Sequence, residues 1–215
     1  GLVACFMAKP FAEESGSGLH VHMSLLDEDG ANFFSQNNKK LIQPPYSKNF
    51  QYAIGGLRDT MSAATAIFAP NANSYRRLRP EMFAPVEPNW GPNHRNVSLR
   101  IPVSDEKNLR FEHRVSGADA NPYLVTAAIL AGLHYGITNQ CHPGEMVKEG
   151  EVISLNQEIP NRWNKAIDAF ASNKVLPSYL GEEFCKTFVA NRRFEELEFN
   201  NKISDIDYNW YLRSV

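Results

Sequence analysis

Three short segments of the chain alternate apolar and polar residues, and this alternation constrains the fold more than any other feature. The segments are residues 19–25, 96–101 and 109–115. Successive side chains of a β-strand point to opposite faces, so each segment has one apolar and one polar side. The polar sides carry His20, His22, Ser24, Arg100, Arg110, Glu112 and Arg114. In one shared sheet, the apolar face would pack on a core and the polar face would collect these imidazoles, guanidiniums and the carboxylate.

Helical periodicity predicts four helices, which cover residues 48–68, 121–138, about 161–172 and about 178–198. Ser47 is the candidate N-cap of the first helix. Asn121 precedes a proline, the arrangement typical of an N-cap and first helical position. Segments rich in Asn, Gln, Pro and Gly are predicted to be loops, at 36–47 and 139–160. We therefore expect an α+β fold: a curved, mainly antiparallel sheet flanked by helices on its apolar side, with the polar side open.

The composition is that of a globular domain. A chain of 215 residues can bury one sizeable core, and its formal net charge of −2 gives no reason to expect nucleic acid or an anionic membrane as partner. No apolar run approaches the roughly 20 residues that span a bilayer. Cys5, Cys141 and Cys185 fit neither a disulfide framework nor a thiolate zinc site. We expect a cytoplasmic protein.

The arginines are unevenly distributed. Seven of the twelve lie between residues 76 and 114. The planar guanidinium matches carboxylate and phosphate groups in bidentate fashion. Such a cluster of cations repels itself unless an anion is held there, so the sequence indicates an anionic, phosphate-bearing ligand. The competing interpretation is an ordinary solvated sheet face, since antiparallel sheets commonly have one wet side.

His20 and Glu112 suggest a metal site as well. An imidazole and a carboxylate on facing strands can share a divalent cation, and Mg²⁺ or Mn²⁺ bound to ATP would neutralise phosphate charge. Two ligands alone do not define a metal site, and a lone histidine is more often structural. Both interpretations remain open on these residues.

Several segments, taken in order, resemble the glutamine synthetase family. They are residues 6–10 (FMAKP), 16–24 (GSGLHVHMS), 73–78 (NSYRRL), 95–96 and 100–102 (RN and RIP), 110–114 (RFEHR), 121–123 (NPY) and 142–145 (HPGE). Their order and spacing match the family from about residue 5 to 145, and joint matches are far more specific than any single motif.

The resemblance implies a role for each site residue. His20 and Glu112 correspond to ligands of the metal that bridges the ATP phosphates. The residues that correspond to nucleotide contacts are His22, Ser24, Arg100, Lys107 and Arg110. Gly16 and Arg77 match positions that hold glutamate, whereas Arg95 and Arg114 match arginines that stabilise the transferring phosphoryl group. The implied reaction converts glutamate and ATP into γ-glutamyl phosphate, from which an amine displaces phosphate.

The resemblance also implies that the chain is the C-terminal part of a longer catalytic domain. The apolar run that begins at Gly1 looks like a strand already under way. Family members have an N-terminal domain and further metal-binding glutamates upstream, and they assemble as homo-oligomeric rings whose active sites form between subunits. We therefore expect residues 1–215 to be inactive alone.

Two departures favour an organic amine over ammonia. Glutamine synthetases proper have a glutamate six residues after the counterpart of Arg77, on a flap near the ammonium pocket, and here that position is Phe83. A phenyl ring can line an apolar pocket or face an alkylammonium. The alternative is that a shifted flap presents Glu81 instead. The adenylylated tyrosine also has no counterpart in residues 147–152. These changes resemble the γ-glutamylpolyamine and γ-glutamylputrescine synthetase branch.

Three alternatives remain. Glutamine synthesis from ammonia is the nearest one, and a non-catalytic relative is the second. Against the second, a retired site has no physical reason to keep costly unpaired charges. The third is a nucleic-acid binder, which would need aromatic rings among the basic residues for base stacking. Phe111 falls on the opposite face, so this alternative is disfavoured.

Overall fold

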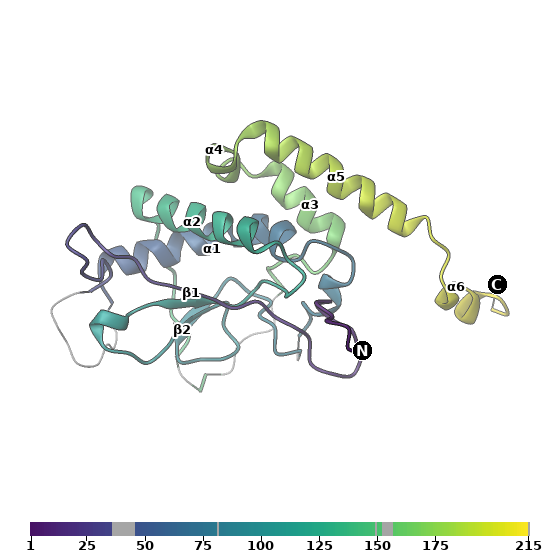
Figure 1. Ribbon diagram of the computed structural model, residues 1–215, viewed down its shortest axis with the longest axis horizontal. Coiled ribbons are helices and arrows are strands. Elements are labelled where there is room, and N and C mark those ends of the chain that lie inside the picture. Colours follow the sequence, from purple (N-terminus) through teal and green to yellow (C-terminus); the bar gives the residue numbers. More distant parts are fainter. Residues whose placement is uncertain (36–45, 81, 149, 152–156, 215) are drawn as a thin grey trace.

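A four-stranded sheet forms the base of the protein (Figure 1). The computed structural model describes residues 1–35, 46–80, 82–148, 150–151 and 157–214. The strands are β1 (Val21–Met23), β2 (Trp90–Pro92), β3 (Leu99–Ile101) and β4 (Phe111–His113), in the order β1-β4-β3-β2. β4 is antiparallel to β1 and β3, whereas β2 is parallel to β3. The sheet is therefore mainly antiparallel, as predicted, but its strands are shorter and β2 was not predicted.

The strand register confirms which side chains share a face. Glu112 lies opposite His22 on one side and opposite Arg100 on the other. His113 lies opposite Val21 and Leu99 in the same way. Because side chains alternate along a strand, the polar residues form one row and the apolar residues form another.

Two helices cover the apolar face of the sheet (Figure 1). These are α1 (Lys48–Phe68) and α2 (Pro122–Asn139). Ser47 accepts a hydrogen bond from the backbone N–H of Phe50, and Asn121 accepts bonds from two N–H groups of the first turn of α2. Both predicted N-caps are confirmed.

Glycines allow α1 and α2 to approach closely. A Cβ on Gly56 would overlap backbone atoms of Gly132 and Gly136, and a Cβ on Gly136 would overlap the backbone of α1. Beneath this contact, core side chains from both helices meet those of the sheet. Ile54, Met61, Leu99, Phe111 and Ile129 are all essentially inaccessible to solvent.

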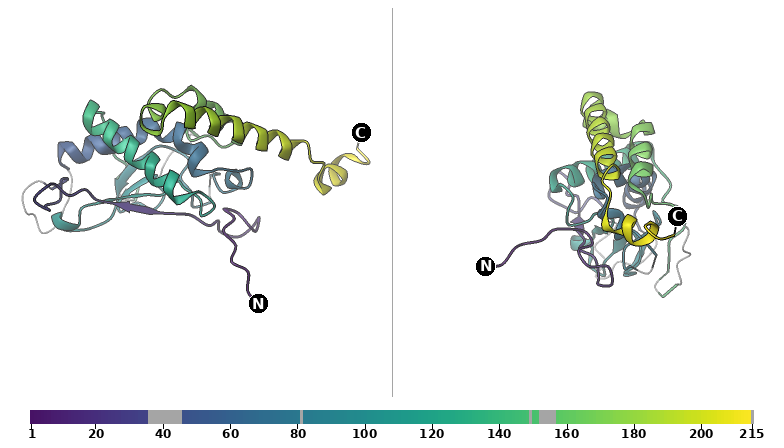
Figure 2. Two further views of the ribbon diagram at one scale, coloured as in Figure 1. Left: turned by 45° about the horizontal axis from the view of Figure 1, so that its top comes forward. Right: turned by 90° about the vertical axis from the view of Figure 1, so that its right-hand side faces the viewer.

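A second helical layer lies over the first (Figures 1 and 2). It consists of α3 (Trp163–Ser172), α4 (Leu176–Leu180) and α5 (Glu182–Asn200). The helix predicted over about 178–198 is confirmed for its main part, α5, but its predicted first residues belong to the separate helix α4. Gly181 has φ of +89°, which is outside the helical region, and it divides the segment into α4 and α5.

The chain continues past α5 into α6 (Asp205–Tyr211), a short helix that was not predicted. It lies beyond the far end of α5, away from the sheet (Figure 2). Ser204 and Asp207 form a reciprocal capping box at its start. Ile206, Trp210 and Tyr211 are exposed.

The predicted loops lie partly within the described residues. Of 36–47, residues 36–45 lie outside them. The described residues between the end of α2 and the start of α3 contain no helix or strand, as expected. In the part of the chain that the structure describes, no helix is both long and apolar enough to cross a membrane.

Candidate active site

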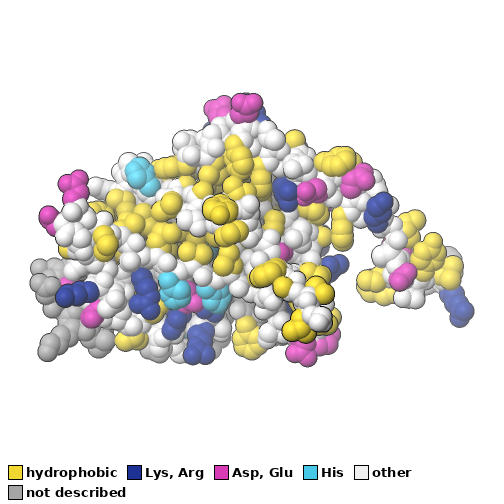
Figure 3. All heavy atoms as spheres, in the orientation of Figure 1, with side chains coloured by type: hydrophobic (Ala, Val, Ile, Leu, Met, Phe, Trp, Pro, Cys, Tyr) yellow, Lys and Arg dark blue, Asp and Glu magenta, His cyan; other side chains and the backbone are white. Residues whose placement is uncertain are grey.

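Glu112 is the centre of the polar face. Its carboxylate Oε1 lies 2.9 Å from Arg114 Nη1 and 3.0 Å from His20 Nδ1, and its Oε2 lies 2.9 Å from Arg100 Nη1. The side chain is only 5% exposed, whereas that of His20 is 38% exposed. In Figure 3, histidine, arginine and acidic side chains gather below a patch of hydrophobic ones. The sheet thus presents one nearly buried anion surrounded by cations and an accessible imidazole.

These neighbours set the charge state of the cluster. Burial alone would raise the pKa of Glu112, but the hydrogen bond from Arg100 and the charge of Arg114 hold it below its usual value. Burial and the charge of Arg114 lower the pKa of His20, against the opposing effect of Glu112. Glu112 is therefore ionised near neutral pH and His20 is neutral, with a lone pair available to a cation.

Arg100 is held in place by two acceptors. One terminal nitrogen donates to Glu112, and the other donates to Asn93 Oδ1 over 2.8 Å. The Nε–H groups of Arg100 and Arg114 are buried and have no hydrogen-bond partner among the residues that the structure describes. Buried donors of this kind favour an additional acceptor, so the cluster has capacity for an anion besides Glu112.

Besides Arg100, four predicted nucleotide contacts remain to be placed: His22, Ser24, Lys107 and Arg110. Arg110 Nε lies 3.3 Å from His22 Nδ1, so these two side chains are brought together. Ser24 and Lys107 are exposed. Neither side chain forms a hydrogen bond or ion pair with the other described residues. The structure therefore leaves Ser24 and Lys107 on the periphery and brings six of the predicted residues together. The six are His20, His22, Arg100, Arg110, Glu112 and Arg114.

Gly16 and Arg77 come together, as their predicted roles require. A Cβ on Gly16 would lie 2.7 Å from the Ala8 carbonyl oxygen and 3.0 Å from Arg77 Cγ. The Arg77 guanidinium donates to the carbonyl oxygens of Val115 and Arg114 over 2.8 and 3.2 Å. Arg77 is 5% exposed, and burial lowers its pKa to about 10. The side chain is still a cation at neutral pH.

Two predicted residues stand apart from the cluster. Arg95 is exposed and has no hydrogen bond or ion pair with the residues that the structure describes, so it does not join Arg114. Phe83 is 79% exposed and has φ of +54°, an uncommon conformation for a bulky residue. Glu81, the other acidic candidate on this flap, lies outside the described residues.

The metal hypothesis fits the donors only in part. The 3.0 Å between His20 Nδ1 and Glu112 Oε1 suits two ligands of one cation, and a neutral imidazole with an ionised carboxylate is the appropriate donor pair. Within the described residues, no group of three or more His, Cys, Asp or Glu side chains is arranged to hold a metal. A divalent ion here would need further oxygen ligands from phosphate or from residues beyond this chain.

Sequence reasoning missed Asn93 and Asp119. Asn93 orients Arg100. Asp119 accepts hydrogen bonds from Asn71 and Ser74, in the turn that leads to Arg77. No strand or helix pattern marks either residue, because each acts through a loop whose course the sequence does not reveal.

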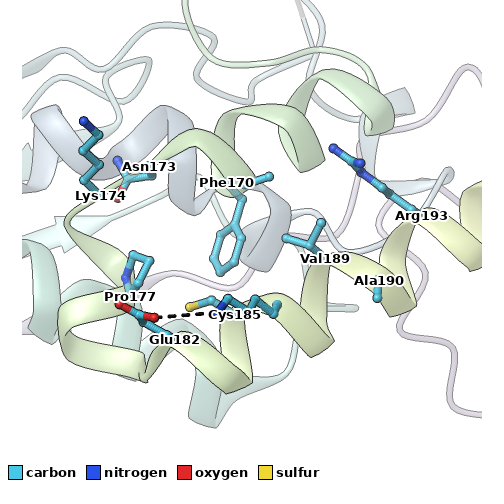
Figure 4. A pocket seen from close by; sticks show the side chains of 11 residues that line it. Phe170, Asn173, Lys174, Pro177, Glu182, Cys185, Val189, Ala190 and Arg193 are labelled. Carbon is cyan, nitrogen blue, oxygen red and sulfur yellow. Dashed lines mark ion pairs between the residues drawn. The ribbon is translucent and has the colours of Figure 1, made fainter.

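A cavity lies away from this cluster, in the second helical layer. It has a volume of about 550 Å³ and lies between α3 and α5. Its lining includes the apolar side chains of Phe170, Cys185 and Val189 as well as Lys174 and Arg193 (Figure 4). None of the predicted site residues lines it. Because the sheet face carries the ionised and unsatisfied groups, we place the candidate active site there and not in this cavity.

A sheet whose polar face concentrates an ionised carboxylate, imidazoles and arginines defines an enzyme-type site for anionic substrates. The comparisons with known proteins make this specific. Residues 1–211 match the family model for the glutamine synthetase catalytic domain. The chain belongs to the glutamine synthetase family.

Two relatives within this family are named for different organic amines. The chain is 40% identical over 212 residues to γ-glutamylputrescine synthetase PuuA of Escherichia coli K12, covering 99% of this chain and 44% of PuuA. It is 33% identical over 216 residues to glutamate–isopropylamine ligase of a Pseudomonas species, covering 99% and 46%. It is 34% identical over 218 residues to glutamine synthetase of Halobacterium salinarum, covering 97% and 47%.

A solved structure of GmaS without ligand supports the same fold. The TM-score is 0.83 at 30% sequence identity, and the match covers 97% of this chain and 48% of GmaS. The α+β architecture predicted from the sequence is thereby confirmed. The chain spans less than half the length of these relatives.

Proposed function

We propose that this chain is the C-terminal part of the catalytic domain of an ATP-dependent glutamate–amine ligase, and that its amine is organic, such as putrescine. The observation that carries the proposal is the cluster around Glu112. It combines a metal-competent imidazole–carboxylate pair with arginines that have unsatisfied donors. Phosphoryl transfer depends mainly on positioning and on stabilisation of charge, which such a cluster supplies.

Each group has a defined task in this proposal. His20 and Glu112 would hold Mg²⁺ or Mn²⁺, which when bound neutralises phosphate charge. His22, Arg100 and Arg110, with the peripheral Ser24 and Lys107, would bind ATP. Arg77 beside Gly16 would bind the substrate glutamate.

The chemistry proceeds in two steps. The γ-carboxylate of glutamate attacks the terminal phosphorus of ATP, so that γ-glutamyl phosphate forms and ADP leaves. The amine nitrogen then attacks the acyl carbon, phosphate departs, and the nitrogen loses a proton. Arg114 would stabilise the transferring group together with Arg95, whose exposed position requires that it move or be ordered by substrate.

The choice of an organic amine rests on Phe83 and on the relatives. Where the glutamine synthetases proper are expected to carry an anion for ammonium, this chain has an exposed ring. Two relatives that cover 99% of the chain are named for putrescine and isopropylamine. The alternatives are a glutamine synthetase that uses ammonia and a non-catalytic family member. We also infer a ring-shaped homo-oligomer for the full-length protein, with residues beyond this chain completing the site.

The decisive experiment measures phosphate release by the full-length protein with ATP, Mg²⁺ and glutamate. Ammonium, putrescine, spermidine, isopropylamine and methylamine are compared at equal concentrations. Higher kcat/KM with an organic amine supports the proposal, and a preference for ammonium supports glutamine synthesis. No turnover with any amine, in protein that is folded and assembled, supports the non-catalytic alternative.

A further inference from the structure

Arg77 is a buried cation held by a short turn. The turn includes a 3-10 helix, η1 (Ser74–Arg76), and the Arg77 N–H donates to the Ser74 carbonyl over 3.1 Å. Its guanidinium reaches the carbonyls that follow β4 and leaves little space beside the glycine loop, since a Cβ on Gly18 would lie 2.9 Å from Arg77 Nη2. The direction of this side chain therefore depends on the position of the turn.

Asp119 fixes that turn from outside. Its Oδ2 accepts a hydrogen bond from Ser74 Oγ over 2.7 Å and another from Asn71 Nδ2 over 2.9 Å. Asn71 Oδ1 in turn accepts from the backbone N–H groups of Asn73 and Ser74. One carboxylate thus braces both ends of the segment from which Arg77 extends.

Asp119 also stabilises the positive charge of Arg77. Burial and the charge of Arg114 both act against the guanidinium, and the negative charge of Asp119 acts in its favour. The Asp119 Oδ1 atom is buried, and no group in the described part of the chain forms a hydrogen bond with it. A carboxylate in such a place is costly unless its charge has a use.

The segment that carries Asp119 is itself tied to the candidate substrate loop. The N–H of Ala118 donates to the Ser17 carbonyl over 3.1 Å, and the N–H of Gly117 donates to the Phe68 carbonyl over 2.9 Å. The segment 117–119 therefore connects the glycine loop, the end of α1 and the turn of Arg77. The Asp119 carboxylate is the part of this segment that contacts the turn.

We propose that Asp119 is a positioning residue for carboxylate-substrate binding, which acts through the Asn71–Ser74 turn and the charge of Arg77. This inference rests on the proposed function, in which Arg77 binds glutamate. In this inference Asp119 affects how tightly glutamate binds. ATP binding and the chemical step depend on the cluster around Glu112 instead.

The test compares Asp119→Asn and Ser74→Ala with wild type in the full-length protein. Asp119→Asn removes the charge, and we expect KM for glutamate to rise about tenfold, the typical effect of losing a hydrogen bond to a charged group. KM for ATP and kcat should change less than about threefold. Ser74→Ala keeps the charge and removes one hydrogen bond, so a smaller rise in KM for glutamate is expected. Asp168→Asn, which removes an exposed ion pair with Arg193, is the matched control and should leave all constants unchanged.

Glutamate binding is also measured directly, by calorimetry without turnover. Weaker glutamate binding in Asp119→Asn with intact ATP binding supports the inference. It is overturned by unchanged glutamate affinity in both variants, or by a parallel loss of glutamate and ATP affinity with general destabilisation. If wild type turns over but the variants behave like it, the proposed function stands and only this inference fails. If wild type binds neither glutamate nor ATP, both fail.

Discussion

Gly56 of α1 and Gly136 of α2 meet through their backbones, with no side chain between them. The contact joins the two helices that cover the sheet, and through them it supports the strands that carry the candidate active site. Close packing of this kind leaves no room for a methyl group.

Gly136→Ala should destabilise the protein. Alanine is the better helix former by about 1 kcal/mol, yet overpacking of a close contact typically costs about 1–3 kcal/mol. We expect a net loss in the free energy of unfolding, measured by urea denaturation. Thr138→Ala, at an exposed position of the same helix, is the control and should change stability by less than about 0.5 kcal/mol. Equal stability of Gly136→Ala and wild type would show that α1 and α2 can move apart enough to fit a methyl group without loss in the free energy of unfolding.

Glu112→Gln should abolish metal-dependent turnover. The amide keeps the shape of the side chain but removes the only acid among Arg100, Arg114 and His20 in the described cluster. We expect phosphate release by the full-length protein to fall at least about 100-fold, in the range for loss of a charged transition-state contact. Mn²⁺ binding, followed by electron paramagnetic resonance, should weaken in parallel. Glu182→Gln on the exposed face of α5 serves as the control, and retained Mn²⁺ affinity in Glu112→Gln would refute the metal assignment.

Arg100→Lys should weaken nucleotide binding even though it conserves charge. Arg100 bridges Glu112 and Asn93 with two different nitrogens, and a single ammonium cannot reproduce this fork. We expect KM for ATP to rise about tenfold with a smaller change in KM for glutamate. The steady-state kinetics of the full-length protein provide the measurement. A rise in KM for glutamate alone would place Arg100 at the other substrate.

Phe83→Glu should shift the preference from organic amine to ammonium. A carboxylate at this exposed position attracts a small cation, whereas the ring offers apolar contact and cation–π attraction of about 0.5–1 kcal/mol. The ratio of kcat/KM for putrescine over ammonium should fall several-fold. Phe83→Leu, which keeps an apolar side chain, is the matched control. An unchanged ratio in Phe83→Glu would remove Phe83 from the amine pocket.

Tyr46→Phe should change the stability of the protein only at alkaline pH. Burial raises the pKa of Tyr46 from 10.0 to about 12. Between these values the phenol ionises in the unfolded state but stays protonated in the native state, so wild type loses stability as the pH rises from 10 to 12. The phenylalanine variant lacks this contribution and should show a flatter profile over that range. Urea denaturation at pH 8, 10 and 11.5 tests the difference, and parallel profiles would contradict it.

The sequence predicts most of the sheet face because strand alternation is a local property. His22, Glu112 and Arg100 occupy one row in the structure because each sits at the right parity of its own strand. The caps at Ser47 and Asn121 were predictable for the same reason, since a cap depends on the next three residues.

The features of the fold and of the candidate site that depend on tertiary contacts were not predicted from the sequence. The pairing of β2 with β3 is parallel, and the β2 segment has no alternating pattern of its own. Gly181 divides a segment whose apolar spacing continues on both sides. Asp119 acts on Arg77 through the turn at Ser74, and Ser74 lies 45 residues before Asp119 in the sequence. In each case the deciding interaction is between segments and not within one.

The exposed α6 has a spectroscopic consequence. Of the three tryptophans, Trp90 and Trp163 are buried and Trp210 is 67% exposed. Acrylamide should therefore quench one emitting population readily and leave a second, blue-shifted population largely intact. Trp210→Phe would remove the quenchable population, so fluorescence alone can report whether α6 is covered in the full-length protein.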